Sequence, residues 1–460
     1  MSEPHTKEAA SGGNKMGTMP IPKLLISMSL PMMISMLVQA LYNIVDSMFV
    51  AQLNEDALTA VSLAFPIQTL MIAIASGTGV GINALLSRNL GEKNYEAADS
   101  AAKNGLFLGI ASCIIFAVIG GLGSHFFFAA QTDNQTIVTY GTQYLTIITV
   151  CSAGIFLQIT LERLMQSTGK TIYNMITQGT GAIINIILDP ILIFGLFGLP
   201  RLEVAGAALA TVIGQVIAVL MSFYFNLTRN KEINISLRGF RPHMRTIAVI
   251  YEVGIPSIIM QAIGSVMTFG MNKILLIFSS TAAAVFGVYF KLQSFIFMPV
   301  FGLNNGMIPI IAFNYGARNK DRIIQTIKLS IIIAVSIMLF GLAIFQTLPG
   351  FLLRNLFDAS ENMLKIGVPA LRIISLSFLF AGYCIIVGSV FQALGNAVYS
   401  LIVSAARQLF VILPVAYVFA RIFGLHMVWW SIPIAEIASV VMSTVLLRHI
   451  YKTKIKQLGT

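Results

Sequence analysis

The sequence has few charged residues for its length. Asp, Glu, Lys and Arg make up only 10% of the 460 residues, whereas 57% are apolar. A soluble domain carries about 25% charged residues, so this chain cannot cover a large water-exposed surface, although it is long enough for two or three soluble domains. The composition therefore predicts one polytopic membrane protein.

The sequence also lacks the motifs of most enzymes. Its three cysteines, Cys113, Cys151 and Cys384, lie inside apolar stretches, which excludes a disulfide scaffold and gives no metal-ligand spacing. There is no Walker motif, HExxH, GxSxG or Cys-His arrangement, and the five histidines are scattered among tails and loops. The run Gly77-Thr-Gly79-Val-Gly81 lies within an apolar stretch with no preceding strand, which favours close helix packing over phosphate binding. We expect no catalytic residue and no cofactor.

Long apolar runs predict the fold class. A spanning helix needs about 20 mostly apolar residues, and the sequence predicts an all-α membrane protein with twelve transmembrane helices, over 24–50, 57–86, 105–127, 140–164, 171–195, 204–226, 247–275, 282–312, 329–348, 366–391, 400–420 and 427–447. The first twenty residues lack the apolar core of a cleavable signal. We therefore expect the first span to be retained.

The basic residues predict the orientation. Twenty of the 29 Lys and Arg residues fall in the N-terminal tail, the even-numbered loops and the C-terminal tail, whereas the odd-numbered loops hold four. Basic loops stay in the cytoplasm, so both termini should be cytoplasmic in a multi-pass plasma-membrane protein. The net charge of +11 then reflects topology and contact with anionic lipid rather than nucleic-acid binding.

The chain repeats itself at an offset of about 225 residues. Pro31 aligns with Pro256, the loop 89–94 aligns with 314–319, and 166–173 aligns with 392–399. Each half holds six spans, so the halves are parallel repeats, which pack about an axis along the membrane normal. The predicted parts are a tail (1–20), a six-helix bundle (21–227), a cytoplasmic linker (228–246), a second six-helix bundle (247–448) and a tail (449–460).

Two acids lie deep in the first-half spans. Asp46 shares a helical face with Gln39 and Asn43, with Tyr42 beside them, and Asp189 shares one with Gln178 and Asn185. Both spans run outward, so the two carboxyl groups should lie at similar depth. Ionisable residues in a membrane are costly and mark functional sites. The alternative is that each acid only hydrogen bonds to a neighbouring helix.

Such a pair predicts ion coupling in the first half. Two carboxylates and nearby amide oxygens would hold a proton near neutral pH or a hard cation such as Na⁺. The repeat equivalents of Asp46, Asn185 and Asp189 are Met271, Val411 and Val415. The scaffold is therefore duplicated, but the acidic site is not.

The second half has charges of its own within its spans. Lys291 is either a gating cation or an ion-pair partner inside the bundle. Glu436 is expected to pair with Lys291 or Arg407, whereas Arg407 alone would extend toward the cytoplasmic surface. In the first half, Glu162 and Arg163 are expected to form an interfacial pair.

These features together resemble the multidrug and toxic compound extrusion (MATE) family. The resemblance covers the chain after about residue 20 and is carried by Pro31 with Asn43-Ile-Val-Asp46, Gln166-x-x-Gly169, Asn185-x-x-x-Asp189-Pro190, Val204-Ala-Gly206-Ala-Ala-Leu-Ala-Thr211, and Arg407-Gln-Leu with Pro414. It implies two six-helix bundles forming a V, and export of hydrophobic, often cationic compounds in exchange for Na⁺ or H⁺.

The pattern looks most like the DinF-like branch of that family. This likeness implies that Asp46, Asn185, Asp189 and Thr211 form the proton or Na⁺ site. Gln39, Tyr42, Asn43 and Gln178 would line the substrate cavity, and Pro31 would let the first span bend. Spans seven and ten carry no central acid, so a second-half Na⁺ site is not expected.

Two other functions fit the sequence less well. A lipid-precursor flippase of the related superfamily should line its cavity with several Arg or Lys residues, but Lys291 is the only central base. A membrane-embedded enzyme would need clustered acids, histidines or a nucleophile at one interface. We therefore expect a monomeric transporter of a prokaryotic plasma membrane that is not an enzyme.

Overall fold

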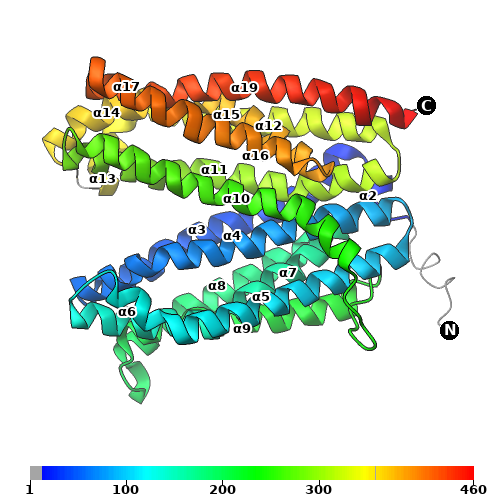
Figure 1. The fold of residues 1–460 in the computed structure, drawn as a ribbon, viewed down its shortest axis with the longest axis horizontal. Coiled ribbons are helices and arrows are strands. Elements are labelled where there is room, and N and C mark those ends of the chain that lie inside the picture. The colour runs from blue at the N-terminus through cyan, green and yellow to red at the C-terminus, as the bar shows by residue number, and fades with distance from the viewer. Residues whose placement is uncertain (1–12, 358, 460) are drawn as a thin grey trace. The chain divides into compact units, whose positions relative to one another are not determined.

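The computed structural model describes residues 13–357 and 359–459, which form helices and connecting turns (Figure 1). Within these residues, eleven helical segments are long and apolar enough to cross a membrane, and a bent helix pair makes a twelfth. The predicted all-helical membrane fold is confirmed. Most of the predicted tail over 1–20 lies outside the described residues.

The first half of the chain contains a short N-terminal helix and six spans, of which the fourth is built from two helices. Their bounds are α2 (Lys15–Thr18), α3 (Ile21–Ala51), α4 (Glu55–Gly91), α5 (Tyr95–Ala129), α6 (Gln135–Val150) with α7 (Ala153–Ser167), α8 (Thr171–Phe194) and α9 (Glu203–Arg229). A short 3₁₀ turn, η1 (Leu196–Gly198), follows α8.

The second half has six spans and more irregular segments. The first three spans are α10 (Met244–Leu276), α11 (Ser280–Gly316) and α12 (Lys320–Thr347). The others are α14 (Glu361–Ser375) with α15 (Phe378–Ala393), then α16 (Ala397–Ala405), η2 (Ala406–Ile412) and α17 (Leu413–Ile422), and last α18 (Leu425–Val428) with α19 (Ser431–Ile450). A short helix α13 (Pro349–Phe357) precedes α14, and η3 (Tyr451–Ile455) and η4 (Lys456–Gly459) follow α19.

The repeat is visible in how the helices begin. Side-chain oxygens cap helix N-termini because they accept from backbone N–H groups that have no partner within the helix. Asn54 caps α4 and Ser279 caps α11, 225 positions apart. Asn94 and Asn319 cap α5 and α12 at the same offset. The two halves are therefore built from the same local signals.

The turns before these caps are also repeated. Lys93 and Arg318 both adopt left-handed backbone conformations, with φ of 58° and 54°. In the first turn Asn94 N–H donates to Asn89 O at 2.9 Å, and in the second Asn319 N–H donates to Asn314 O at 2.9 Å. The fourth and tenth spans break at equivalent places too, at residues 151–152 and 376–377, and α14 and α15 meet at 49°.

The described chain divides into two compact units. Among the described residues, unit 1 contains 13–18 and Ile34–Gly254, and unit 2 contains Met19–Met33 and the residues from Ile255 to 459. The long helices α3 and α10 each contribute to both units. Their assignment changes within three residues of Pro31 in α3 and beside Pro256 in α10, where the missing proline N–H weakens the helical hydrogen bonding.

Candidate functional site

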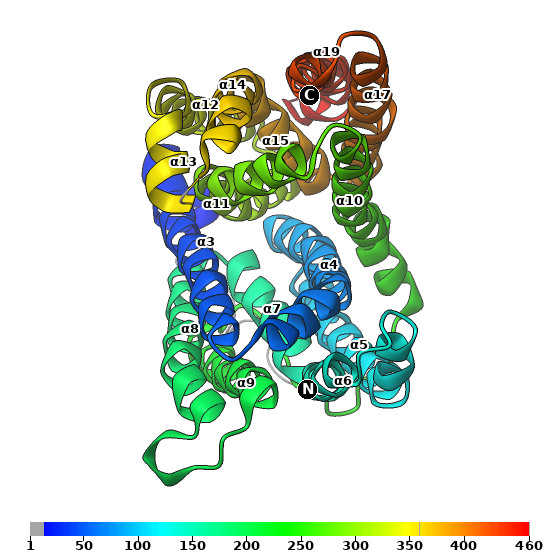
Figure 2. The ribbon, with the colours of Figure 1, turned by 90° about the vertical axis from the view of Figure 1, so that its left-hand side faces the viewer.

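Helices α8 and α9 of unit 1 pack side by side through glycines (Figure 2). A Cβ atom added at Gly214 would lie 2.6 Å from Gly181 O, and one added at Gly206 would lie 2.5 Å from Leu192 O. Only glycine permits such a close backbone approach. Gly181 precedes Asn185 by one turn and Gly214 follows Thr211 by one turn, so this contact sets the distance between those two polar side chains.

We expect Gly214→Ala to separate these helices. The new methyl group would meet the backbone oxygen of Gly181 rather than a mobile side chain. Overpacking of this kind costs about 1–3 kcal/mol. Unfolding of the purified protein in detergent should therefore begin at a lower temperature. Gly179→Ala is the matched control, because a Cβ there meets nothing within 4 Å. Equal melting temperatures for the two variants would contradict this account of the packing.

A buried polar centre lies beside this contact. Asn185 Nδ2 donates to Thr211 Oγ1 at 3.2 Å, and the Tyr42 side chain lies near Thr211. The carboxyl groups of Asp46 and Asp189 lie within hydrogen-bonding reach of each other. The structure thus brings together five of the predicted site residues from α3, α8 and α9.

The centre holds more oxygen acceptors than donors. Asp189 is fully buried, and within the described residues no N–H or O–H group donates to either of its carboxylate oxygens. Asp46 Oδ1 and Asn185 Oδ1 are likewise buried without a donor among those residues. Unsatisfied buried oxygens are costly. This surplus fits a proton, or a hard cation that takes oxygen ligands.

Two residues near the acid pair were not predicted. Tyr144 of α6 is buried, interacts electrostatically with Asp46, and accepts a hydrogen bond from Gln68 Nε2 of α4 at 2.7 Å. A single tyrosine in an apolar helix forms no sequence pattern that would mark it as a site residue. Gln68 could have been noticed, because its equivalent in the second half of the repeat is also a glutamine, Gln293.

The residues predicted for a substrate cavity lie in different places. Gln39 and Asn43 are exposed on α3, whereas Tyr42 is half-buried within the polar centre. Gln178 is eleven residues from Asp189, about 16 Å along α8, and its Nε2 donates to Glu162 Oε2 at 2.6 Å. A shared cavity for these four residues stays a prediction.

Glu162 forms a second polar centre in unit 1. The sequence predicted an interfacial pair with Arg163, but both residues are buried. The Glu162 carboxylate also accepts hydrogen bonds from Gln158 at 3.0 Å and Thr177 at 3.3 Å. Arg163 Nη1 donates to Gln166 Oε1 at 2.8 Å. The opposite charges of Glu162 and Arg163 also attract each other, so the sequence missed their burial and their further hydrogen-bond partners rather than the pairing.

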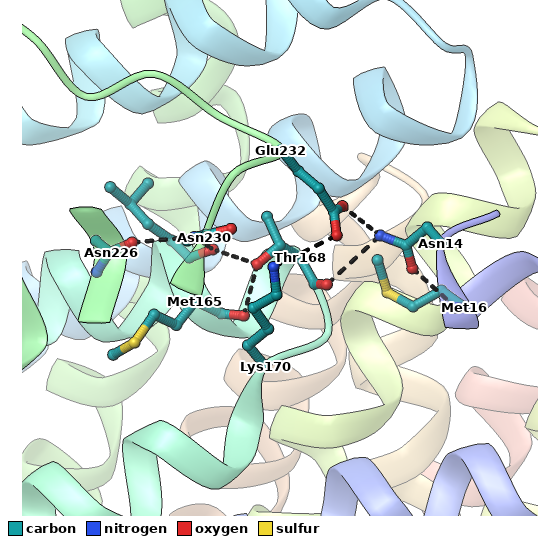
Figure 3. Close-up of polar contacts among 9 residues, drawn as sticks. Asn14, Met16, Met165, Thr168, Lys170, Asn226, Asn230 and Glu232 are labelled. Atoms are coloured by element: carbon teal, nitrogen blue, oxygen red, sulfur yellow. Dashed lines mark hydrogen bonds and ion pairs between the residues drawn. The ribbon is translucent and has the colours of Figure 1, made fainter. Parts of the chain in front are cut away.

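The N-terminal helix α2 packs on unit 1 near the start of α8 (Figure 3). Asn14 Nδ2 donates to Glu232 Oε2 at 2.6 Å, and Lys170 Nζ lies 3.6 Å from Glu232 Oε1. Met16 is fully buried. Burial lowers the pKa of Lys15, the Lys170 cation lowers it further, and Glu232 opposes both effects. This cluster therefore joins α2 to the start of α8 and to the segment after α9.

Unit 2 holds a buried ion pair. Arg407, in the π-helical segment η2, donates through Nη1 to Glu436 Oε1 in α19. The side chain of Glu436 is 6% exposed and that of Arg407 is 26% exposed. Of the two partners predicted for Glu436, the structure selects Arg407, which therefore does not simply extend to the surface. Lys291 is exposed on α11.

The comparison with known sequences matches both halves of the repeat. The sequence model of the family named MatE matches residues 31–191 and again 256–418, so the two matches begin at Pro31 and Pro256. The chain belongs to the MATE family. The two matches confirm that the repeat relates one whole MATE unit to another.

Individual MATE proteins agree with this assignment. The multidrug export protein MepA of Staphylococcus haemolyticus is 30% identical over 415 residues, which cover 90% of each chain. A solved multidrug resistance MATE transporter of the MOP superfamily, in an outward-facing conformation, has a TM-score of 0.90 at 25% identity and covers 98% of this chain and 99% of its own. A MOP superfamily transporter from Pyrococcus furiosus, described as having a binding pocket of reverse polarity, has a TM-score of 0.88 at 25% identity, with the same coverage.

Proposed function

We propose that this MATE protein exports bulky, hydrophobic and often cationic compounds in exchange for H⁺ or Na⁺, as a DinF-like member of the family. Family membership and the likeness to a protein named as a multidrug exporter support export. The observation that carries ion coupling is the pair formed by half-buried Asp46 and fully buried Asp189, whose buried oxygens exceed the available donors within the described residues. Asn185 and Thr211 complete the proposed site.

In the proposed cycle the transporter alternates between outward-open and inward-open states. A proton or Na⁺ from outside binds at Asp46 and Asp189 and neutralises them. The electrostatic attraction for a bound cationic compound is then lost, α3 bends at Pro31, and the compound leaves outward. The inward-open state releases the ion to the cytoplasm. No cofactor takes part.

We further propose a monomer in a prokaryotic plasma membrane with both termini in the cytoplasm. The support is the distribution of Lys and Arg, which lie mainly in the tails and the even-numbered loops. The segment between α9 and α10 carries Lys231, Arg238 and Arg241, with Arg229 at the end of α9 and Arg245 at the start of α10, and it would be the longest cytoplasmic loop. In this orientation the N-terminal cluster of Figure 3 would lie at the cytoplasmic end of unit 1.

The coupling ion is tested in proteoliposomes loaded with a cationic dye such as ethidium. One set carries an imposed pH gradient and the other an imposed Na⁺ gradient at constant pH. We expect one of the two gradients to accelerate dye movement against its own gradient several-fold over protein-free vesicles. Dye movement at the same rate with and without each gradient would refute ion-coupled export.

A further inference from the structure

A groove in unit 2 lies between α12 and the C-terminal end of the chain. It has a volume of about 620 Å³, within the range of small-molecule sites. Ile324, Ile327 and Ile331 of α12 line one side, and Leu447, Tyr451 and Ile455 line the other. These residues give the groove an apolar surface on both sides.

Four basic residues also line this groove: Lys328, Arg448, Lys452 and Lys456. All four are exposed, and no carboxylate lines the groove. Within the described residues, none of the four forms an ion pair. Two neighbouring lysines are engaged instead, since Lys454 Nζ donates to Leu394 O at 2.9 Å and Lys320 lies over the Tyr451 ring. The groove thus has uncompensated positive charge.

The depth of these charges matches a membrane surface. The ninth predicted span begins at residue 329 and the twelfth ends at residue 447. These predicted edges would put Lys328 and Arg448 at the boundary of the hydrocarbon. Lys452 and Lys456 extend beyond it. Deeper on the same two helices, Ile332, Val441 and Val445 are each at least 60% exposed. An amphipathic ligand would meet cations at one end and apolar surface at the other.

We propose that this groove binds one anionic phospholipid of the cytoplasmic leaflet. Its phosphate would lie among Lys328, Arg448 and Lys452, and its acyl chains would follow the exposed apolar surface of α12 and α19. Basic pockets between transmembrane helices on the cytoplasmic side suit anionic headgroups. The topology rule alone explains basic residues near the cytoplasm but not an apolar hollow between them.

The binding rests on the proposed orientation but not on transport, so it is measured on the purified full-length protein. Native mass spectrometry would follow titration of the delipidated protein with palmitoyl-oleoyl phosphatidylglycerol, and with phosphatidylcholine carrying the same chains. We expect one tight site for phosphatidylglycerol. In R448Q/K452Q/K456Q its affinity should fall about 100-fold, because each surface cation contributes about fivefold.

The matched control removes the same charges elsewhere. K93Q/K231Q/R241Q changes one Arg and two Lys residues that are exposed in unit 1, and its phosphatidylglycerol affinity should stay within about threefold of wild type, because these residues lie outside the groove. Ile331→Trp keeps every charge but fills the groove, and it should weaken binding of phosphatidylglycerol as well. It provides an independent test if the triple variant folds poorly.

Three results would overturn the proposal. The first is equal loss of phosphatidylglycerol binding in the groove and control triple variants. The second is wild-type binding of phosphatidylcholine as tight as that of phosphatidylglycerol. The third is displacement of phosphatidylglycerol by an equal concentration of inorganic phosphate, which would make the groove a site for free anions. Failure of dye export in proteoliposomes would leave all three measurements unchanged.

Discussion

Asp189→Asn should reduce ion-driven dye efflux to the level of protein-free vesicles. Asp189 is fully buried, and within the described residues neither carboxylate oxygen accepts a hydrogen bond. Asparagine has nearly the same size but cannot alternate between a charged and a neutral form. If the pair is discharged and recharged in each cycle, the variant is fixed in the neutral state and the coupling free energy between ion and substrate disappears.

Asp46→Asn is expected to have the same effect, because the two carboxyl groups lie within hydrogen-bonding reach. The double variant should then be no worse than either single variant, since residues that act as a unit are not additive. Asp133→Asn is the control: it makes the same chemical change at an exposed acid in the turn before α6 and should leave efflux unchanged.

Efflux and folding are measured on the same preparations. Each variant should melt within a few degrees of wild type, because an amide tolerates burial better than a carboxylate. Wild-type efflux in either single variant at normal expression would refute the coupling role. A fully additive double variant would mean that the two acids act at separate steps.

Much of the fold was predictable because hydrophobicity and duplication both leave strong patterns. The apolar runs predicted all twelve spans, and the duplicated loops predicted two related halves. The breaks within the fourth and tenth spans were not predicted. Neither break contains a proline, and the apolar run continues through Cys151-Ser152 and Leu376-Ser377. No local sequence pattern therefore marks either break.

The candidate site was predictable where helical periodicity fixes a face. Spacing placed Asn185 and Asp189 together on one side of α8, and counting residues along the spans put Asp46 at their depth. It was harder to predict which polar residues contact each other. The spacing could not show that the Glu162 carboxylate accepts a hydrogen bond from Gln178, nor that Glu436 takes Arg407 rather than Lys291. These choices depend on how helices rotate and cross, which glycine contacts such as Gly181 with Gly214 decide.

The second large effect is expected in unit 2, where Arg407→Met should lower the free energy of unfolding by about 3–5 kcal/mol. The substitution leaves the Glu436 carboxylate with no cation, although its side chain is only 6% exposed. Glu436 Oε2 already lacks a hydrogen-bond partner within the described residues. A buried charge without a partner destabilises the folded protein far more than an exposed charge without a partner does.

Glu436→Gln should cost less than Arg407→Met. It leaves a cation whose side chain is 26% exposed and long enough to move its charge toward a more polar region. The double variant R407M/E436Q should recover much of the loss seen in R407M, because no charge then stays buried. Unfolding in detergent with a chemical denaturant would measure all three variants against wild type.

The pair Arg354 and Glu361 provides the matched control within the same unit. These side chains also form an ion pair, at 3.1 Å, but they are 62% and 79% exposed. Arg354→Met should therefore cost about 0–1 kcal/mol. If R354M destabilised the protein as much as R407M, burial would not be the cause. If R407M/E436Q were no more stable than R407M, the loss would come from the arginine's packing in η2 rather than from the isolated Glu436 charge.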